Sequence, residues 1–236
     1  HWPGSTLAGK AWGVGRSESQ ETCPDTRHRN RSSREGPGEC SHPDPWPDAG
    51  WGSSFLSFTM RSRRSSLLVL GGSRSGKSGY ALAEAQARGG EVAFVATAEP
   101  LDAEMAERIE RHRRSRPPSW LTVEEPWDLP KALDGLAERA DTVVVDCVSL
   151  WVSNRVQREE RDDLITKDVE ALAALAADPP FSLILVSNEV GCGGVPLTPM
   201  GRRFSDLLGS VNQRLAAAAD RVVLVVAGLP FTLKEE

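Results

Sequence analysis

The sequence has few cysteines, no long apolar run and no excess of one sign of charge. Its four cysteines, at positions 23, 40, 147 and 192, form neither a C-x-x-C pair nor the spacing of a zinc site. No apolar run approaches the roughly 20 residues of a membrane-spanning helix, and the first residues lack the charged start and apolar core of a secretory signal. With a formal net charge of −5, no overall basic field favours nucleic acid as a partner. These absences favour a protein of the reducing cytoplasm that neither spans a membrane nor binds nucleic acid.

Residues 1–65 differ in composition from the rest of the chain. They are rich in Gly, Pro, Ser, Arg and Asp and show no apolar periodicity. Such a segment cannot bury enough apolar surface to offset the entropy lost on ordering it. We therefore expect a disordered N-terminal extension over residues 1–65 and one folded domain over residues 66–236. We also hypothesise that the extension is dispensable and lies upstream of a true start at Met60.

The folded domain is organised around a phosphate-binding loop. A short apolar run, Leu67 to Leu70, ends in GGSRSGKS, whose spacing from Gly71 to Ser78 fits G-x-x-x-x-G-K-[ST]. The backbone N–H groups of such a loop point at phosphate, its lysine reaches the β- and γ-phosphates, and its serine can complete the shell of a Mg²⁺ ion. A turn rich in glycine and serine could match by accident, but the apolar run before it and the helical pattern after it argue against this. The sequence therefore predicts that the chain binds a nucleoside triphosphate.

Strand-like and helix-like patterns alternate after residue 67. Strands are expected at 67–70, 91–97, 120–124, 142–147, 181–187 and 221–227, and helices at 78–88, 102–114, 129–140, 162–177 and 201–219. This alternation predicts an α/β fold of the P-loop NTPase type, a doubly wound, mostly parallel sheet with helices on both faces.

In an open parallel sheet, ligands bind beyond the carboxyl ends of the strands. In this sequence those positions are the phosphate loop, Thr97, Glu124, Asp146 and Asn188-Glu189. Asp146 ends the most apolar strand and resembles the acidic residue that binds Mg²⁺, directly or through water, in such proteins. The alternative is a carboxylate that only ends a strand.

His112 is the only histidine of the predicted domain, and it lies on a charged, mostly exposed helix. Five arginines share that region: Arg108, Arg111, Arg113, Arg114 and Arg116. Nearby cations keep an imidazole neutral, as a nucleophile requires, and they attract phosphate. A run of arginines on a helix is, however, often only a solvated face. The residues alone therefore leave His112 open between a nucleophile and a surface side chain.

Four ordered segments carry a resemblance to a known family. They are GGSRSGKS at 71–78, VATAEPLDAEMAERIERHRRSRPPSWLTVEEP at 95–126, VVVDCVSLWVSN at 143–154 and LVSNEVGCGGVPLTPMGRRFSDLLGSVNQRLAAAADRVVLVVAGLP at 185–230. Together they resemble the bifunctional adenosylcobinamide kinase / adenosylcobinamide-phosphate guanylyltransferases. The resemblance implies two steps. The first phosphorylates adenosylcobinamide with ATP or GTP; the second transfers GMP from GTP to adenosylcobinamide phosphate, giving adenosylcobinamide-GDP. Mg²⁺ is the implied cofactor.

The resemblance also implies roles for individual residues. By its place in RIERHRRSRP, His112 matches the histidine that carries GMP covalently, and Lys77 is the second implied catalytic residue. The implied nucleotide contacts are Gly71, Gly72, Ser73, Arg74, Ser75, Gly76, Lys77, Ser78, Thr97, Ala98, Glu99, Arg113, Arg114, Ser115, Arg116, Glu124 and Asp146, and the implied metal ligands are Ser78 and Asp146. The helix at 102–114, which carries His112, follows the second expected strand at 91–97. We therefore expect this helix or its flanking loops to move to bring His112 to the nucleotide.

Three questions stay open at this point: the oligomeric state, the place where the corrinoid binds, and which of the two activities the chain retains. The resemblance implies a homo-oligomer, a trimer, which would account for apolar residues such as Trp151 near strand ends. Candidate corrinoid sites are the loop at 188–196 and a subunit interface. The alternatives are a small-molecule kinase with the same loop, a member that retains only the guanylyltransferase activity, and, from another class, a non-catalytic nucleotide-binding regulatory module.

Overall fold

A computed structural model describes residues 64–114 and 116–235. The expectations for the N-terminal extension and for a start at Met60 concern residues outside that range. Within the described part of the chain, no helix is both long enough and apolar enough to cross a membrane.

The described residues form one seven-stranded sheet with the order β3-β2-β4-β5-β1-β6-β7. Its strands are β1 (Ser66–Gly71), β2 (Val92–Ala96), β3 (Leu121–Glu124), β4 (Thr142–Asp146), β5 (Ser182–Asn188), β6 (Arg221–Val226) and β7 (Leu229–Glu235). Strands β1 to β6 all run parallel to their neighbours, and only β7 is antiparallel, to β6. The carboxyl ends of six strands therefore meet at one edge of the sheet.

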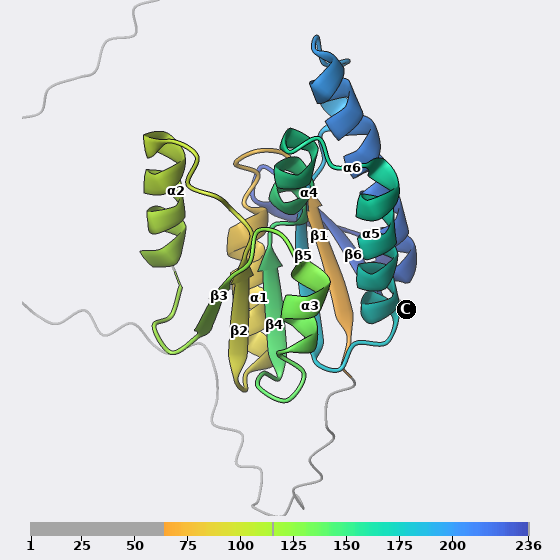
Figure 1. The fold of residues 1–236 in the computed structure, drawn as a ribbon. Coiled ribbons are helices and arrows are strands. Elements are labelled where there is room, and N and C mark those ends of the chain that lie inside the picture. The colour runs from red at the N-terminus through yellow and green to blue at the C-terminus, as the bar shows by residue number, and fades with distance from the viewer. Residues whose placement is uncertain (1–63, 115, 236) are drawn as a thin grey trace, which may run out of the picture. The chain divides into compact units, whose positions relative to one another are not determined.

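Helices cover both faces of this sheet (Figure 1). They are α1 (Lys77–Arg88), α2 (Ala103–Arg114), α3 (Leu129–Asp134), α4 (Val148–Gln157), α5 (Asp162–Ala177) and α6 (Pro199–Ala218), with a short 3-10 turn η1 (Gly191–Gly193). The alternation of side chains along a strand divides the core into two. In β1, Leu68 and Leu70 join the core under α3, α4, α5 and α6, while Leu67 and Val69 join the core under α1. The predicted α/β class, mostly parallel sheet and two-sided helix cover are confirmed.

One helix, α2, belongs to neither core. None of its described residues is buried, and Figure 1 shows it standing outside the helix layers that cover the sheet. This agrees with the predicted exposure of the helix at 102–114. Its position must therefore come from contacts other than core packing.

Two elements were not predicted from the sequence. Helix α4 follows β4 directly, and most of its residues are buried, so it has no polar face to reveal a helical period. Strand β7 forms a hairpin with β6 through Ala227 and Gly228, whose φ angles of 52° and 82° are both positive. An Ala-Gly pair is not among the common sequence signals of such a turn. Pro230 in the following segment is also unfavourable in the interior of a sheet, so the sequence did not indicate a strand there.

Trp151 corrects one expectation. A trimer would have accounted for an apolar Trp151 near a strand end, but in the structure this side chain is fully buried within the chain. It belongs to the core under α4, and its indole Nε1 donates a hydrogen bond of 2.7 Å to the carbonyl of Trp127. Trp151 is thus accounted for by the fold of one chain and carries no argument about assembly.

We predict that Trp151→Ala destabilises the chain by about 3–5 kcal/mol, because it leaves a large cavity and removes the indole hydrogen bond. Chemical denaturation followed by circular dichroism measures the change in the free energy of unfolding. Leu164→Ala, at a side chain that is 46% exposed, serves as the control and should change stability by less than about 1 kcal/mol. Equal effects of the two substitutions would contradict the assignment of Trp151 to the core.

Candidate functional site

The phosphate loop begins where β1 ends, and the backbone is crowded there. Gly71 pairs with Asn188 of β5 and with Val225 of β6. A Cβ atom on Gly71 would lie 2.4 Å from Ser75 Oγ and 2.6 Å from the Val225 carbonyl oxygen. The Gly228 N–H also donates to the Ser75 carbonyl at 2.8 Å, which ties the loop to the β6–β7 hairpin. Glycine at position 71 is therefore a requirement of packing.

The loop leads into α1 through Gly76, which has a φ of 97° and forms the N-cap without a side-chain hydrogen bond. The first N–H groups of α1 are thus left without a capping side chain, as anion-binding helix N-termini require. Lys77 follows immediately, with 9% of its surface exposed and its Nζ 3.2 Å from the Gly72 carbonyl. Burial lowers the pKa of Lys77, and the nearby Asp146 carboxylate acts in the opposite direction. The loop therefore holds a partly desolvated cation that a phosphate would neutralise.

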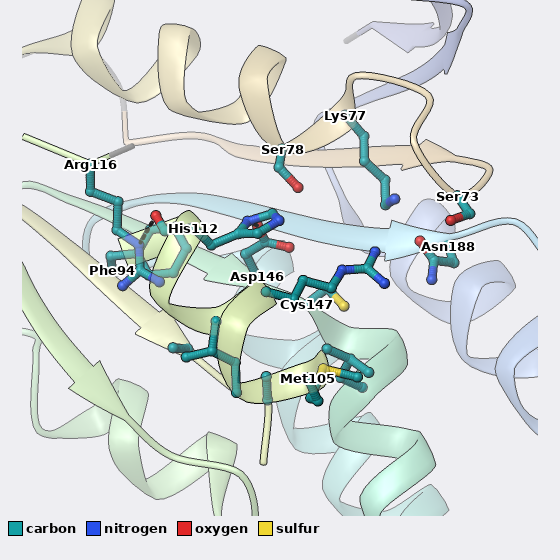
Figure 2. Close-up of a pocket in the computed structure, with 15 residues that line it drawn as sticks. Ser73, Lys77, Ser78, Phe94, Met105, His112, Arg116, Asp146, Cys147 and Asn188 are labelled. Carbon is teal, nitrogen blue, oxygen red and sulfur yellow. Dashed lines mark hydrogen bonds and ion pairs between the residues drawn. The ribbon is translucent and has the colours of Figure 1, made fainter. Parts of the chain in front are cut away.

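His112 lies beside the loop in the structure. Its Nδ1 is 3.9 Å from Oδ2 of Asp146, and the two side chains are 43% and 12% exposed. The sequence predicts a movement of α2 or of its flanking loops to bring His112 to the nucleotide. In the structure His112 already lies beside Asp146, in the cavity that Lys77 and Ser78 also line (Figure 2). The reason is the strand order: β2 pairs with β4, so Ala96 lies next to Asp146 and α2 departs from the same edge of the sheet.

Two cavities meet at this edge. The first has an apolar wall, formed by Phe94, Ala96, Ala98, Met105, Ile109, Cys147 and Leu150, and a polar side, formed by Ser73, Lys77, Ser78, Arg108, His112, Arg116, Asp146 and Asn188. The second lies between the loop and α2 and is lined by Arg74, Ser75, Gly76, Lys77, Ser78, Gly79, Glu104, Arg108, Arg111 and His112. The first cavity offers an apolar surface for a ring system, and the second a cationic groove for phosphates.

Arg116 fixes the end of α2 that carries His112. Its guanidinium carbon lies 3.8 Å from the centre of the Phe94 ring, and its Nε donates to the His112 carbonyl at 3.1 Å. Burial lowers the pKa of Arg116, with Asp146 acting in the opposite direction. Stacking on Phe94 and the hydrogen bond to His112 together hold the last turn of α2 against the sheet.

Other predicted nucleotide contacts lie outside both cavities. Thr97 is fully buried, and its hydroxyl donates to the Cys147 carbonyl at 2.7 Å and accepts from the Cys147 N–H at 2.9 Å, so it joins the ends of β2 and β4. Glu99 pairs with Arg158 at 3.4 Å. Arg113, Arg114 and Glu124 are exposed and line neither cavity, and Ser115 lies outside the described residues. Their nucleotide contacts stay predictions.

A divalent cation fits the polar groups at this edge. Ser78 and Asp146 supply a hydroxyl and a carboxylate to the first cavity, the oxygen donors that Mg²⁺ prefers. The amide Oδ1 of Asn188, in the same cavity, is buried without a hydrogen-bond partner among the described residues. No group of three or more His, Cys, Asp or Glu in the described part of the chain could hold a metal by itself. This donor set suits an ion that is completed by phosphate and water.

Apart from Ala98, the apolar wall of the first cavity was not predicted from the sequence, and Arg108 was not singled out among the five arginines near His112. A usable signal was present on α2, where Met105, Ile109 and His112 recur at intervals of four and three residues on an otherwise charged helix. Arg108 falls on the same face as His112, four residues before it. The contributions of Phe94 and Leu150 depend on the strand order and had no local signal.

We predict that Gly71→Ala destabilises the chain by about 1–3 kcal/mol, because the new methyl group must displace Ser75 and the backbone of Val225. Gly72→Ala is the matched control for stability, since no atom lies within 4 Å of a Cβ placed there, and its effect should stay within about 0.5 kcal/mol. Denaturant titration of both variants measures the change in the free energy of unfolding that each substitution causes. Equal stability of the two would show that the loop relaxes more easily than its packing indicates.

Comparison with known proteins identifies relatives over nearly all of the described part. Residues 67–233 match the family cobinamide kinase / cobinamide phosphate guanyltransferase. The chain is 43% identical over 169 residues to the bifunctional adenosylcobalamin biosynthesis protein CobP of Pseudomonas aeruginosa, which covers 72% of this chain and 97% of that protein. It is 37% identical over 180 residues to the bifunctional adenosylcobalamin biosynthesis protein CobU of Escherichia coli, covering 71% and 99%. It is also 37% identical over 183 residues to the protein of the same name from Salmonella typhimurium, covering 71% and 99%.

Proposed function

The chain belongs to the cobinamide kinase / cobinamide phosphate guanyltransferase family, and on that premise we propose that it performs both reactions at the edge built by the phosphate loop, α2 and β4. In the first it phosphorylates adenosylcobinamide with ATP or GTP. In the second it transfers GMP from GTP to adenosylcobinamide phosphate, giving adenosylcobinamide-GDP. The observation that carries the proposal is the position of His112, beside Asp146 and within the same cavity as Lys77 and Ser78.

Guanylyl transfer proceeds through His112. Because Nδ1 faces the Asp146 carboxylate, Nε2 is the nitrogen that attacks the α-phosphorus of GTP. A bond forms between Nε2 and phosphorus, the bond from phosphorus to the bridging oxygen breaks, and pyrophosphate leaves with that electron pair. A phosphate oxygen of adenosylcobinamide phosphate then attacks the same phosphorus and returns the electron pair to Nε2. Asp146 stabilises the positive charge on the ring while GMP is attached.

The kinase step uses the same loop with a different acceptor. Lys77 and the N–H groups at the start of α1 hold the terminal phosphates. Ser78 and Asp146 would hold Mg²⁺, which would neutralise charge on the phosphates. The hydroxyl oxygen of the aminopropanol arm attacks the γ-phosphorus, and the bond from that phosphorus to the β–γ bridging oxygen breaks. The nucleoside diphosphate leaves with that electron pair, and the hydroxyl proton passes to solvent water. Asn188 Oδ1, whose acceptor capacity is unused among the described residues, is placed to receive a hydrogen bond from that hydroxyl or from a water on the metal.

The corrinoid lies outside the nucleotide site in this scheme. We place it over the loop at 188–196, where Val195 is 81% exposed, because this loop leaves β5 directly after Asn188. The chain would act as a homo-oligomer, a trimer, as the resemblance implies, and a neighbouring subunit would then complete the corrinoid site.

We predict that GTP labelled at the α-phosphate labels the protein, and that His112→Ala abolishes the label while GTP affinity changes by no more than a few-fold. The label should be acid-labile and base-stable, as expected of a phosphoramidate. Arg161→Ala, at an exposed side chain paired with Asp163, is the control and should label like the unmodified chain. An unmodified chain that binds GTP but takes no label would indicate a kinase or a regulatory module instead.

We predict that Lys77→Ala lowers both activities by about 100-fold or more, since one cation serves the terminal phosphates in both reactions. The kinase activity is measured with adenosylcobinamide, and the transferase activity with its phosphate. Guanylyl transfer that persists at the normal rate in Lys77→Ala would refute a shared phosphate site.

A further inference from the structure

Four residues line both cavities at the carboxyl edge of the sheet. Lys77 and Ser78 come from the phosphate loop, and Arg108 and His112 come from α2. A phosphate chain bound by the loop therefore passes between two pairs of side chains, one on each wall. The proposed function gives roles to Lys77, Ser78 and His112. It gives none to Arg108.

The position of Arg108 on α2 is close to that of His112. The two residues are four positions apart, so their side chains lie on one face of the helix, one turn from each other. Arg108 is also near enough to Lys77 that its charge contributes to lowering the Lys77 pKa, although burial is the main cause. Arg108 thus lines both cavities together with the loop lysine and the histidine, on the wall that α2 contributes opposite the loop.

Arg108 differs from neighbouring arginines on α2 in its contacts. Arg111 pairs with Glu107 at 3.0 Å, and Arg114 pairs with Glu110 at 2.9 Å, each across one helical turn. Within the described part of the chain, Arg108 has neither a hydrogen bond nor an ion pair, although Glu104 stands one turn before it. Its guanidinium, which can bind two phosphate oxygens at once, is therefore uncommitted at the opening of a cationic groove.

From these contacts we propose that Arg108 is a further catalytic residue, which binds the β-phosphate of the GTP donor and neutralises the pyrophosphate as it leaves. The inference rests on the proposed function, because it assumes that GMP passes to His112. When Nε2 bonds to the α-phosphorus, the electron pair of the breaking bond moves to the bridging oxygen, which stays with the β-phosphate. Negative charge thus accumulates at the group that Arg108 contacts. A cation placed where charge develops lowers the barrier of that step.

This role separates the first half of guanylyl transfer from the second. Pyrophosphate takes part in formation of the GMP–enzyme and in its reversal, but not in transfer of GMP to the acceptor phosphate. Removing Arg108 should therefore slow the two steps that involve pyrophosphate and spare the third. A residue that only holds α2 in place would affect all three steps, because each of them needs His112 in position.

The test compares the unmodified chain with Arg108→Ala, Arg108→Lys and the control Arg161→Ala. Rapid-quench measurements with α-labelled GTP give the rate of label formation. Isolated labelled protein then gives the rate of label loss to inorganic pyrophosphate and, separately, to adenosylcobinamide phosphate. For Arg108→Ala we expect a loss of about 100-fold or more in the two pyrophosphate steps and a change of no more than about three-fold in transfer to the acceptor. Arg108→Lys should recover part of the loss.

Other outcomes overturn the inference. Normal label formation in Arg108→Ala, or equal losses in all three steps, would exclude a contact with the leaving pyrophosphate. Because α2 contributes no buried residue, these substitutions should leave the thermal unfolding temperature unchanged, and this is checked for each variant. Failure of the unmodified chain to take any label is a separate result, which counts against the proposed function itself.

Discussion

The rest of the structure depends on one steric constraint, the close packing of the backbone around Gly71 at the end of β1. β1 is paired on both sides, with β5 and with β6, so at Gly71 the chain must turn out of the sheet with no room for a side chain. This forces the loop to fold back over the strand ends, with Lys77 drawn inward and α1 aimed at the same point. Strand pairing thus decides where the candidate phosphate site lies.

A second strand pairing, between β2 and β4, positions Asp146 and the start of the segment that leads to α2. β2 and β4 are neighbours, and the Thr97 hydroxyl joins their ends through both the N–H and the carbonyl of Cys147. Asp146, which directly precedes Cys147, therefore lies at this edge beside the end of β2, from which the chain leads to α2. In contrast, α2 contributes no buried residue, and its C-terminal end is held by the stacking of Arg116 on Phe94. One side of the site is thus the edge of the sheet, which carries Asp146. The other side is α2, which contributes no buried residue and whose C-terminal end is held by Arg116 on Phe94.

The sequence predicted the features that one stretch of chain reveals better than those that depend on the order of the strands. The phosphate loop, the parallel sheet and the placement of Asp146 follow from local patterns, because strand ends and glycine spacing are visible in one stretch of chain. The nucleotide contact of Thr97 stays a prediction, but its hydroxyl also bonds the backbone of Cys147, a contact that depends on β4 being the partner of β2. Phe94 and Leu150 were missed because their place in the cavity likewise depends on the strand order. Helix α4 was missed because burial on nearly all sides removes the periodicity by which helices are recognised.

The chemistry of the first cavity narrows the choice of nucleophile within the described residues. Cys147 lines it, but burial raises the pKa of its thiol to about 11, so at neutral pH only about one molecule in ten thousand carries the reactive thiolate. Lys77 is directed to the Gly72 carbonyl, and Ser78 has no neighbouring base in hydrogen-bond contact among the described residues. His112 alone pairs a nucleophilic nitrogen with a carboxylate on its other side. Burial at the strand end therefore keeps the Cys147 thiol protonated, which supports the proposal that His112, on the exposed helix, is the nucleophile.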